Sequence, residues 1–127
     1  MKLIIGGYAQ GKLDYVLEKY GMENVSVWEG TLPNSKELAE KTVVINHFHN
    51  WVRNRMAEGG CPQQEVRLFL EQYRDCIIIS DEIGNGIVPQ DPLEREYREC
   101  TGRILIQIAE RAEEVERVLC GIGQRIK

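Results

Sequence analysis

The chain has 127 residues and a formal net charge of −4, with 43% hydrophobic and 28% charged residues. These values exclude an intrinsically disordered chain and are typical of a globular protein with one core. No basic stripe indicates a nucleic-acid partner, and no apolar run approaches the roughly 20 residues that a membrane helix needs. The length is that of one domain, so we expect a single domain over residues 1–127. The sequence shows no signal peptide, and we therefore expect a cytoplasmic location without a membrane partner.

Strand-like and helix-like patterns alternate from one end of the chain to the other. In chain order, strands are predicted at residues 2–5, 25–28, 42–45, 77–79 and 116–120, and helices at residues 12–20, 35–40, 47–56, 63–74 and 92–111. This alternation predicts an α/β fold in which helices cover both faces of a mostly parallel sheet. We therefore predict a three-layer domain with a sheet of about five strands.

A glycine-rich turn links the first predicted strand to the first helix. Its residues, Gly6-Gly7-Tyr8-Ala9-Gln10-Gly11-Lys12, fit the phosphate-loop pattern G-x-x-x-x-G-K in the required strand–loop–helix context, which makes the predicted domain P-loop-type. In such a loop, backbone N–H groups and the helix N-terminus attract phosphate, and the lysine reaches the outer phosphates of a nucleotide.

The phosphate-loop pattern is degenerate at the position after the lysine. A hydroxyl that binds Mg²⁺ belongs there, but this chain has Leu13, whose side chain cannot coordinate a metal. We expect residues 6–12 to bind a nucleotide, with Lys12 as a catalytic candidate and magnesium binding in doubt. The alternative is a tight turn that no longer binds phosphate.

Two histidines, His47 and His49, follow the third predicted strand. They could face the same way and form a metal or phosphate site, with Asp81 as a third ligand. A polar strand-to-helix junction is the more common outcome, because two-ligand clusters are weak signals. We therefore predict no metal site.

Asp81 and Glu82 follow the fourth predicted strand, where an open α/β sheet presents its site residues. One carboxylate could hold Mg²⁺ or act as a base on a substrate hydroxyl. Alternatively, one caps the turn while Glu82 pairs with Arg95 or Arg98. Both interpretations stay open, and the two carboxylates join Lys12 as catalytic candidates.

Three blocks of sequence carry a resemblance to a known family. They are the phosphate loop with Gly6, Gly7, Gly11 and Lys12; the run Glu82, Ile83, Gly84, Gly86, Ile87, Val88 and Pro89, followed by Arg95, Tyr97, Arg98, Gly102 and Arg103; and the C-terminal set Ala112, Glu114, Val115, Gly121, Ile122, Ile126 and Lys127. Together they resemble the bifunctional adenosylcobinamide kinase/adenosylcobinamide-phosphate guanylyltransferases of cobalamin biosynthesis.

The chain departs from the family pattern in ways that bear on activity. Leu13 replaces the magnesium ligand, and Leu105-Ile106 stands where family members carry Asn-Gln. The family's middle segment holds an H-H-x-x-R histidine that becomes guanylylated, but no histidine lies between Gly21 and the third predicted strand. We therefore expect guanylyltransferase activity to be lost.

The resemblance implies a nucleotide-binding protein of cobalamin biosynthesis that binds GTP or ATP weakly. It also implies cobinamide as a second ligand and a homotrimer as the assembly. If the protein is an enzyme, the resemblance implies an NTP-dependent adenosylcobinamide kinase, a phosphotransferase. The alternative is a non-catalytic homologue that binds a nucleotide or corrinoid, or serves as an assembly partner. Lys12 favours the first interpretation and Leu13 favours the second.

Overall fold

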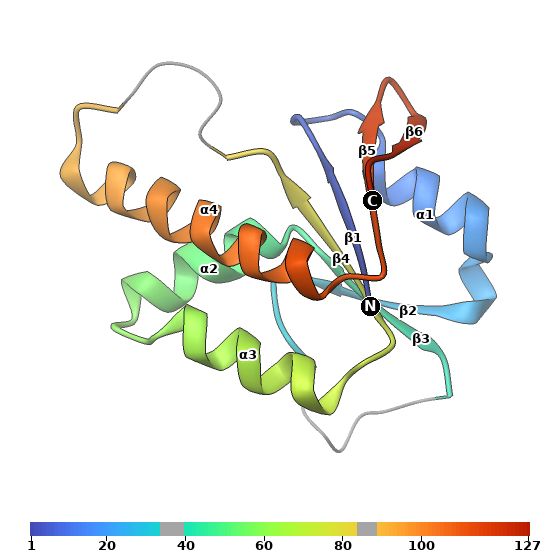
Figure 1. Cartoon of the computed structure of the whole chain (residues 1–127), viewed down its shortest axis with the longest axis horizontal. Coiled ribbons are helices and arrows are strands. Elements are labelled where there is room, and N and C mark those ends of the chain that lie inside the picture. The colour runs from blue at the N-terminus through green and yellow to red at the C-terminus, as the bar shows by residue number, and fades with distance from the viewer. Residues whose placement is uncertain (34–39, 84–88) are drawn as a thin grey trace.

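The computed structural model describes residues 1–33, 40–83 and 89–127 and shows a sheet between two layers of helices (Figure 1). Its elements are β1 Lys2–Gly6, α1 Lys12–Tyr20, the 3₁₀ turn η1 Met22–Asn24, β2 Val25–Glu29, β3 Thr42–Asn46, α2 Phe48–Ala57, α3 Pro62–Gln72, β4 Cys76–Asp81, α4 Pro92–Arg111, β5 Glu114–Leu119 and β6 Ile122–Arg125. Residues 34–39 and 84–88 lie outside the described residues. They include nearly all of the helix expected at residues 35–40, and the glycines at 84 and 86.

The six strands lie in the order β2-β3-β4-β1-β5-β6. Neighbours from β2 to β5 pair in parallel, whereas β5 and β6 form an antiparallel hairpin. The predicted α/β fold is therefore confirmed, and the prediction of about five strands is close to the six found among the described residues. The turn at Cys120 and Gly121, both with positive φ, ends β5 earlier than expected and starts the extra strand.

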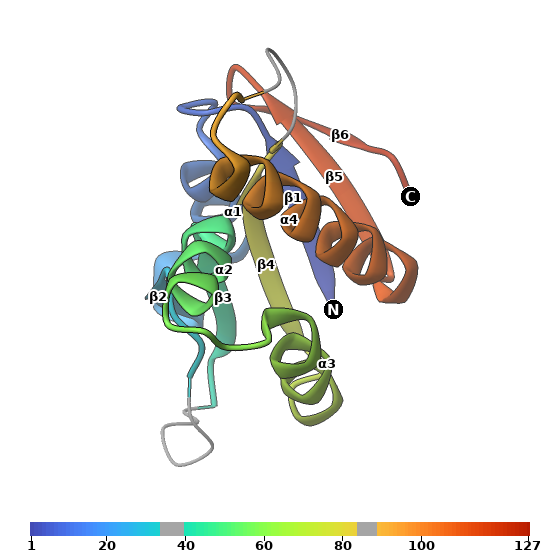
Figure 2. The same ribbon diagram turned by 90° about the vertical axis from the view of Figure 1, so that its left-hand side faces the viewer.

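The larger core lies between one face of the sheet and the three helices α2, α3 and α4, which Figure 2 shows in front of the strands. Successive strand residues point to opposite faces, so Leu3 enters this core while Ile4 enters the other. Each helix contributes a buried stripe: Phe48, Trp51 and Val52; Val66, Phe69 and Leu70; Tyr97, Ile104 and Ile108. This packing fixes the carboxyl ends of β3 and β4 relative to α2.

The opposite face of the sheet carries a smaller core beneath α1. Val16 of this helix is fully buried against Ile4, Val44 and Ile79, and Leu13 packs against the same cluster. The helix thus connects the end of β1 to one face, while the chain after β4 continues into α4 on the other. The ends of β1 and β4 form a topological switch point, where open α/β sheets bind ligands.

None of the helices among the described residues is long and apolar enough to cross a membrane.

Candidate functional site

The glycine-rich loop leaves β1 close to the neighbouring strand β5. A Cβ atom added at Gly6 would lie 2.5 Å from the carbonyl oxygen of Val118, so this position admits only glycine without movement. Gly11 then takes a left-handed conformation (φ 82°) immediately before α1, and its carbonyl accepts the backbone N–H of Tyr15 at 3.0 Å. The loop therefore turns tightly and delivers the N-terminus of α1 to the switch point, the geometry that attracts an anion.

The β5–β6 turn holds the glycine-rich loop from the side. The Gln10 carbonyl accepts the backbone N–H of Gly121 at 2.8 Å, and the Gln10 side-chain oxygen accepts that of Cys120 at 2.7 Å. Sequence reasoning missed this contact because the hairpin itself was not predicted. Two hydrogen bonds from one residue fix the middle of the loop against the far end of the chain.

Lys12 points back into its own loop and is nearly buried. Its Nζ lies 2.7 Å from Asp81 Oδ1 and donates to the Gly7 carbonyl at 2.7 Å, with only 7% of the side chain exposed. Asp81 is the last residue of β4 and stands beside Gly6 in the parallel register. The two predicted catalytic candidates are therefore in contact, and a phosphate that approaches Lys12 meets the Asp81 carboxylate as a competitor.

Both ring nitrogens of His49 contact Asp81. Nδ1 accepts the Asp81 backbone N–H at 3.1 Å, and Nε2 lies 3.3 Å from Asp81 Oδ2. An accepting Nδ1 leaves the proton of the neutral ring on Nε2, where it can donate to the carboxylate. The pKa of His49 is lowered, and burial of the ring is the largest cause. The charge of Asp81 raises this pKa, whereas the charges of His47, Lys12 and Arg53 lower it further. The neutral imidazole thus holds Asp81 in place.

A second polar cluster lies at the ends of the edge strand β2 and its neighbour β3. Glu29 accepts a hydrogen bond from the Asn46 amide at 2.6 Å, and its other oxygen is 2.8 Å from His47 Nδ1. Burial would raise the pKa of Glu29, but these two hydrogen bonds outweigh it and the pKa falls below its usual value. His47 itself is held in the left-handed region, with φ 51° and ψ 47°.

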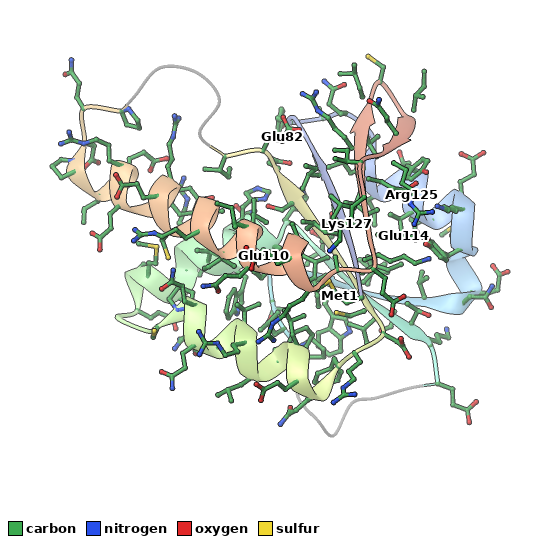
Figure 3. The ribbon with its side chains drawn as sticks, in the orientation of Figure 1. Met1, Glu82, Glu110, Glu114, Arg125 and Lys127 are labelled. Carbon is green, nitrogen blue, oxygen red and sulfur yellow. The ribbon has the colours of Figure 1, made fainter. Side chains whose placement is uncertain are left out.

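Glu82 lies at the end of β4 but takes part in a different interaction. Its backbone N–H donates to the Gly6 carbonyl at 2.9 Å, and its carboxylate pairs with Arg117 of β5 at 2.7 Å. Arg117 is a partner of Glu82 that the sequence did not suggest. Figure 3 shows Glu82 at the upper end of the sheet.

An open pocket of about 300 Å³ lies over the glycine-rich loop and the adjoining strand ends. The residues that line it are Tyr8, Ala9, Gln10, Gly11, Lys12, Leu13, Asp14, Asn46, His47 and Asp81. The structure thus brings most of the predicted phosphate loop together with Asp81, and adds Asn46 and His47. Gly6, Gly7 and Glu82, all described, are not among the lining residues.

The lining residues offer little to a metal ion. Leu13, at the position of the expected hydroxyl ligand, has no oxygen and packs its side chain toward the smaller core. Within residues 1–33, 40–83 and 89–127, no three His, Cys, Asp or Glu side chains gather in a group that could hold a metal.

An α/β sheet with a G-x-x-x-x-G-K loop at its switch point defines a protein of the P-loop type. The profile of one family, described as cobinamide kinase / cobinamide phosphate guanyltransferase (CobU), matches residues 21–126, and the chain belongs to that family.

Two curated relatives carry the name bifunctional adenosylcobalamin biosynthesis protein CobU. The Escherichia coli (strain K12) protein is 43% identical over 67 residues, and the Salmonella typhimurium (strain LT2) protein is 34% identical over 67 residues. Each match covers 50% of this chain and 37% of the relative. The family profile begins at residue 21, so the case for the phosphate loop rests on its own sequence and geometry.

Proposed function

We propose that this protein binds a nucleoside triphosphate, GTP or ATP, through residues 6–12, and that it serves cobalamin biosynthesis as a nucleotide-dependent member of the cobinamide kinase family. The observation that carries this proposal is the placement of Lys12 and the N-terminus of α1 at the switch point between β1 and β4. Family membership supports the pathway and supports cobinamide as a second ligand. A single cytoplasmic domain that assembles as a homotrimer completes the proposal.

Guanylyl transfer is not part of the proposed function. A nucleophilic route would need an unprotonated side chain in line with the leaving pyrophosphate. No histidine occurs between Gly21 and Thr42, the stretch where the family resemblance places the guanylylated histidine. We expect intact-mass measurement after incubation with GTP and Mg²⁺ to show no added GMP, and an adduct would contradict this part of the proposal.

A non-catalytic role is the second candidate, and two observations favour it. Asp81 neutralises the charge of Lys12 at 2.7 Å, and Leu13 offers no metal ligand. Such a protein would bind a nucleotide or a corrinoid without turnover, or would act as an assembly partner. The two candidates differ in what they predict for phosphoryl transfer.

A thermal-shift panel with ATP, GTP and cobinamide, each with and without Mg²⁺, tests the proposed binding. A ligand at 100 times its Kd stabilises the native state by about 2.7 kcal/mol. We expect ATP or GTP to raise the melting temperature of the wild type with little added effect of Mg²⁺. Lys12→Ala should abolish the shift, whereas the charge-matched Lys41→Ala, at an exposed position before β3, should keep it. No nucleotide shift in the wild type would refute the proposal, and a shift with cobinamide alone would favour the second candidate.

A further inference from the structure

The Glu29–His47 pair lies beside the phosphate loop and takes no part in the Lys12–Asp81 contact. His47 lines the same pocket as residues 8–14, and 46% of its side chain is exposed. Glu29, at the end of β2, is held by two hydrogen bonds, one from Asn46 and one from His47. The Glu29 carboxylate therefore contacts the His47 imidazole, and the imidazole lines the open pocket.

The hydrogen bonds fix which nitrogen of His47 faces a ligand. An ionised carboxylate only accepts, so the 2.8 Å contact with Glu29 places the ring proton on Nδ1. In the neutral ring, Nε2 then carries the lone pair. Among the described residues, Nε2 has no hydrogen-bond partner. Its environment is that of a base oriented by a third group, the arrangement that activates hydroxyls in many enzymes.

The left-handed backbone conformation of His47 indicates that this residue has a functional role. A histidine with φ 51° is in a conformation that costs an L-residue free energy, and such residues cluster at functional sites. This conformation ends β3 and starts α2 directly, with the His47 carbonyl accepting the Asn50 N–H at 2.9 Å. It leaves the imidazole at the pocket, while His49 two residues on is buried against Asp81.

We propose that His47 Nε2 is the general base for transfer of a phosphoryl group to an alcohol, a role that rests on the proposed nucleotide binding. The alcohol oxygen attacks the terminal phosphorus of the nucleoside triphosphate while its proton passes to Nε2. The bond from that phosphorus to the bridging oxygen breaks and a nucleoside diphosphate leaves. The imidazolium, paired with Glu29, then returns its proton to solvent through its exposed edge.

Asp81 is less suited to this step. One of its oxygens binds Lys12 at 2.7 Å and the other lies 3.3 Å from His49 Nε2, so both are engaged. Leu13 offers no metal ligand beside the phosphates. We therefore assign to His47 a role in activating the acceptor alcohol. Glu29 and His49 are the titratable groups in contact with the His47 ring. The other charged or titratable groups that line the pocket are Tyr8, Lys12, Asp14 and Asp81.

The test uses His47→Gly, because glycine tolerates positive φ and leaves room for added imidazole. Phosphate transfer from labelled ATP or GTP to the alcohol of cobinamide is measured from pH 5.5 to 8.5, and nucleotide binding is followed separately by calorimetry. We expect His47→Gly to lower kcat by about 100-fold, the range of a lost general base, with nucleotide affinity unchanged. Free imidazole should restore at least a tenth of the rate, and Glu29→Gln should give an intermediate loss.

Each outcome has one meaning for the proposal. A wild type that binds nucleotide but transfers nothing to the alcohol overturns the role of His47 and leaves the proposed binding intact. A His47→Gly variant that keeps its rate, or that loses it without recovery by imidazole, also overturns the role. A wild type that binds no nucleotide refutes the proposed function itself, and the base falls with it.

Discussion

Replacing Asp81 by asparagine should strengthen anion binding at the phosphate loop. The carboxylate lies 2.7 Å from Lys12 Nζ and forms an ion pair with the ammonium group that would otherwise bind a phosphate. Asparagine keeps the shape of the side chain and an oxygen that can accept from Lys12, but it removes the negative charge. The change therefore separates competition by charge from disruption of the loop.

The geometry gives the size of the effect. A phosphate oxygen bound to Lys12 at about 2.8 Å would lie on the order of 5 Å from the Asp81 carboxylate. Two unit charges at this separation repel by about 3 kcal/mol at an effective dielectric of about 20. Part of this is offset because the neutral amide of the variant binds Lys12 less strongly than the carboxylate does. We expect a net gain of at least about tenfold in affinity, or about 1.4 kcal/mol.

Calorimetric titration of wild type and Asp81→Asn with inorganic phosphate and with ATP measures this gain. Asp75→Asn is the matched control, since Asp75 is exposed just before β4, at the opposite end of the same strand. Without ligand, Asp81→Asn should melt below the wild type, because it leaves the nearly buried Lys12 without its counter-ion. Equal or weaker phosphate binding by Asp81→Asn would show that Asp81 does not compete for Lys12.

Three further predictions follow from contacts around the site. Gly6→Ala should destabilise the protein by about 1–3 kcal/mol, because the new Cβ meets the Val118 carbonyl oxygen at 2.5 Å. The control Gly102→Ala in α4, where a new Cβ meets nothing within 4 Å, should stabilise the protein by up to about 1 kcal/mol. Urea unfolding measures both, and a Gly6→Ala variant more stable than Gly102→Ala would contradict the close approach of Gly6 to Val118. Gln10→Ala removes the side-chain acceptor of the Cys120 N–H, so hydrogen exchange at Cys120 should speed up while exchange in α3 is unchanged. His49 has a lowered pKa in the folded state, so the unfolded chain binds a proton first as the pH falls below about 6.5. Stability should therefore drop as the pH falls through about 6.5, by at most about 1.4 kcal/mol per pH unit, and this drop should shrink in His49→Gln.

The fold class and most elements could be predicted because their signals are local. Apolar runs such as residues 77–79 and the helical spacing of residues 12–20 each depend on neighbours in sequence. The last strand, β6, has mostly exposed residues and pairs with one neighbour only, so it lacks the apolar pattern that marks the others. The two-residue turn with Gly121 was its one available signal.

The site was predicted in part for the same reason. The pattern of residues 6–12 and the position of Asp81 after a strand indicate that both belong at the carboxyl edge of a sheet. Their contact depends on β1 and β4 being neighbours, which no local pattern states. The Glu29–His47 pair depends likewise on the pairing of β2 with β3, and the Arg117 partner of Glu82 on the arrangement of β4, β1 and β5.

The central place of β1 has a consequence for how the protein is made. This strand precedes both of its neighbours in the chain by a long stretch, since the first residues of β4 and β5 that pair with it are Ile77 and Glu114. Pairings of such long sequence separation form slowly, since the intervening chain must be ordered first. The loop of residues 7–11 is also held by Cys120 and Gly121. A nascent chain should therefore gain the ability to hold an anion only after Gly121 has been added, and truncations that remove Cys120 and Gly121 should lose it abruptly.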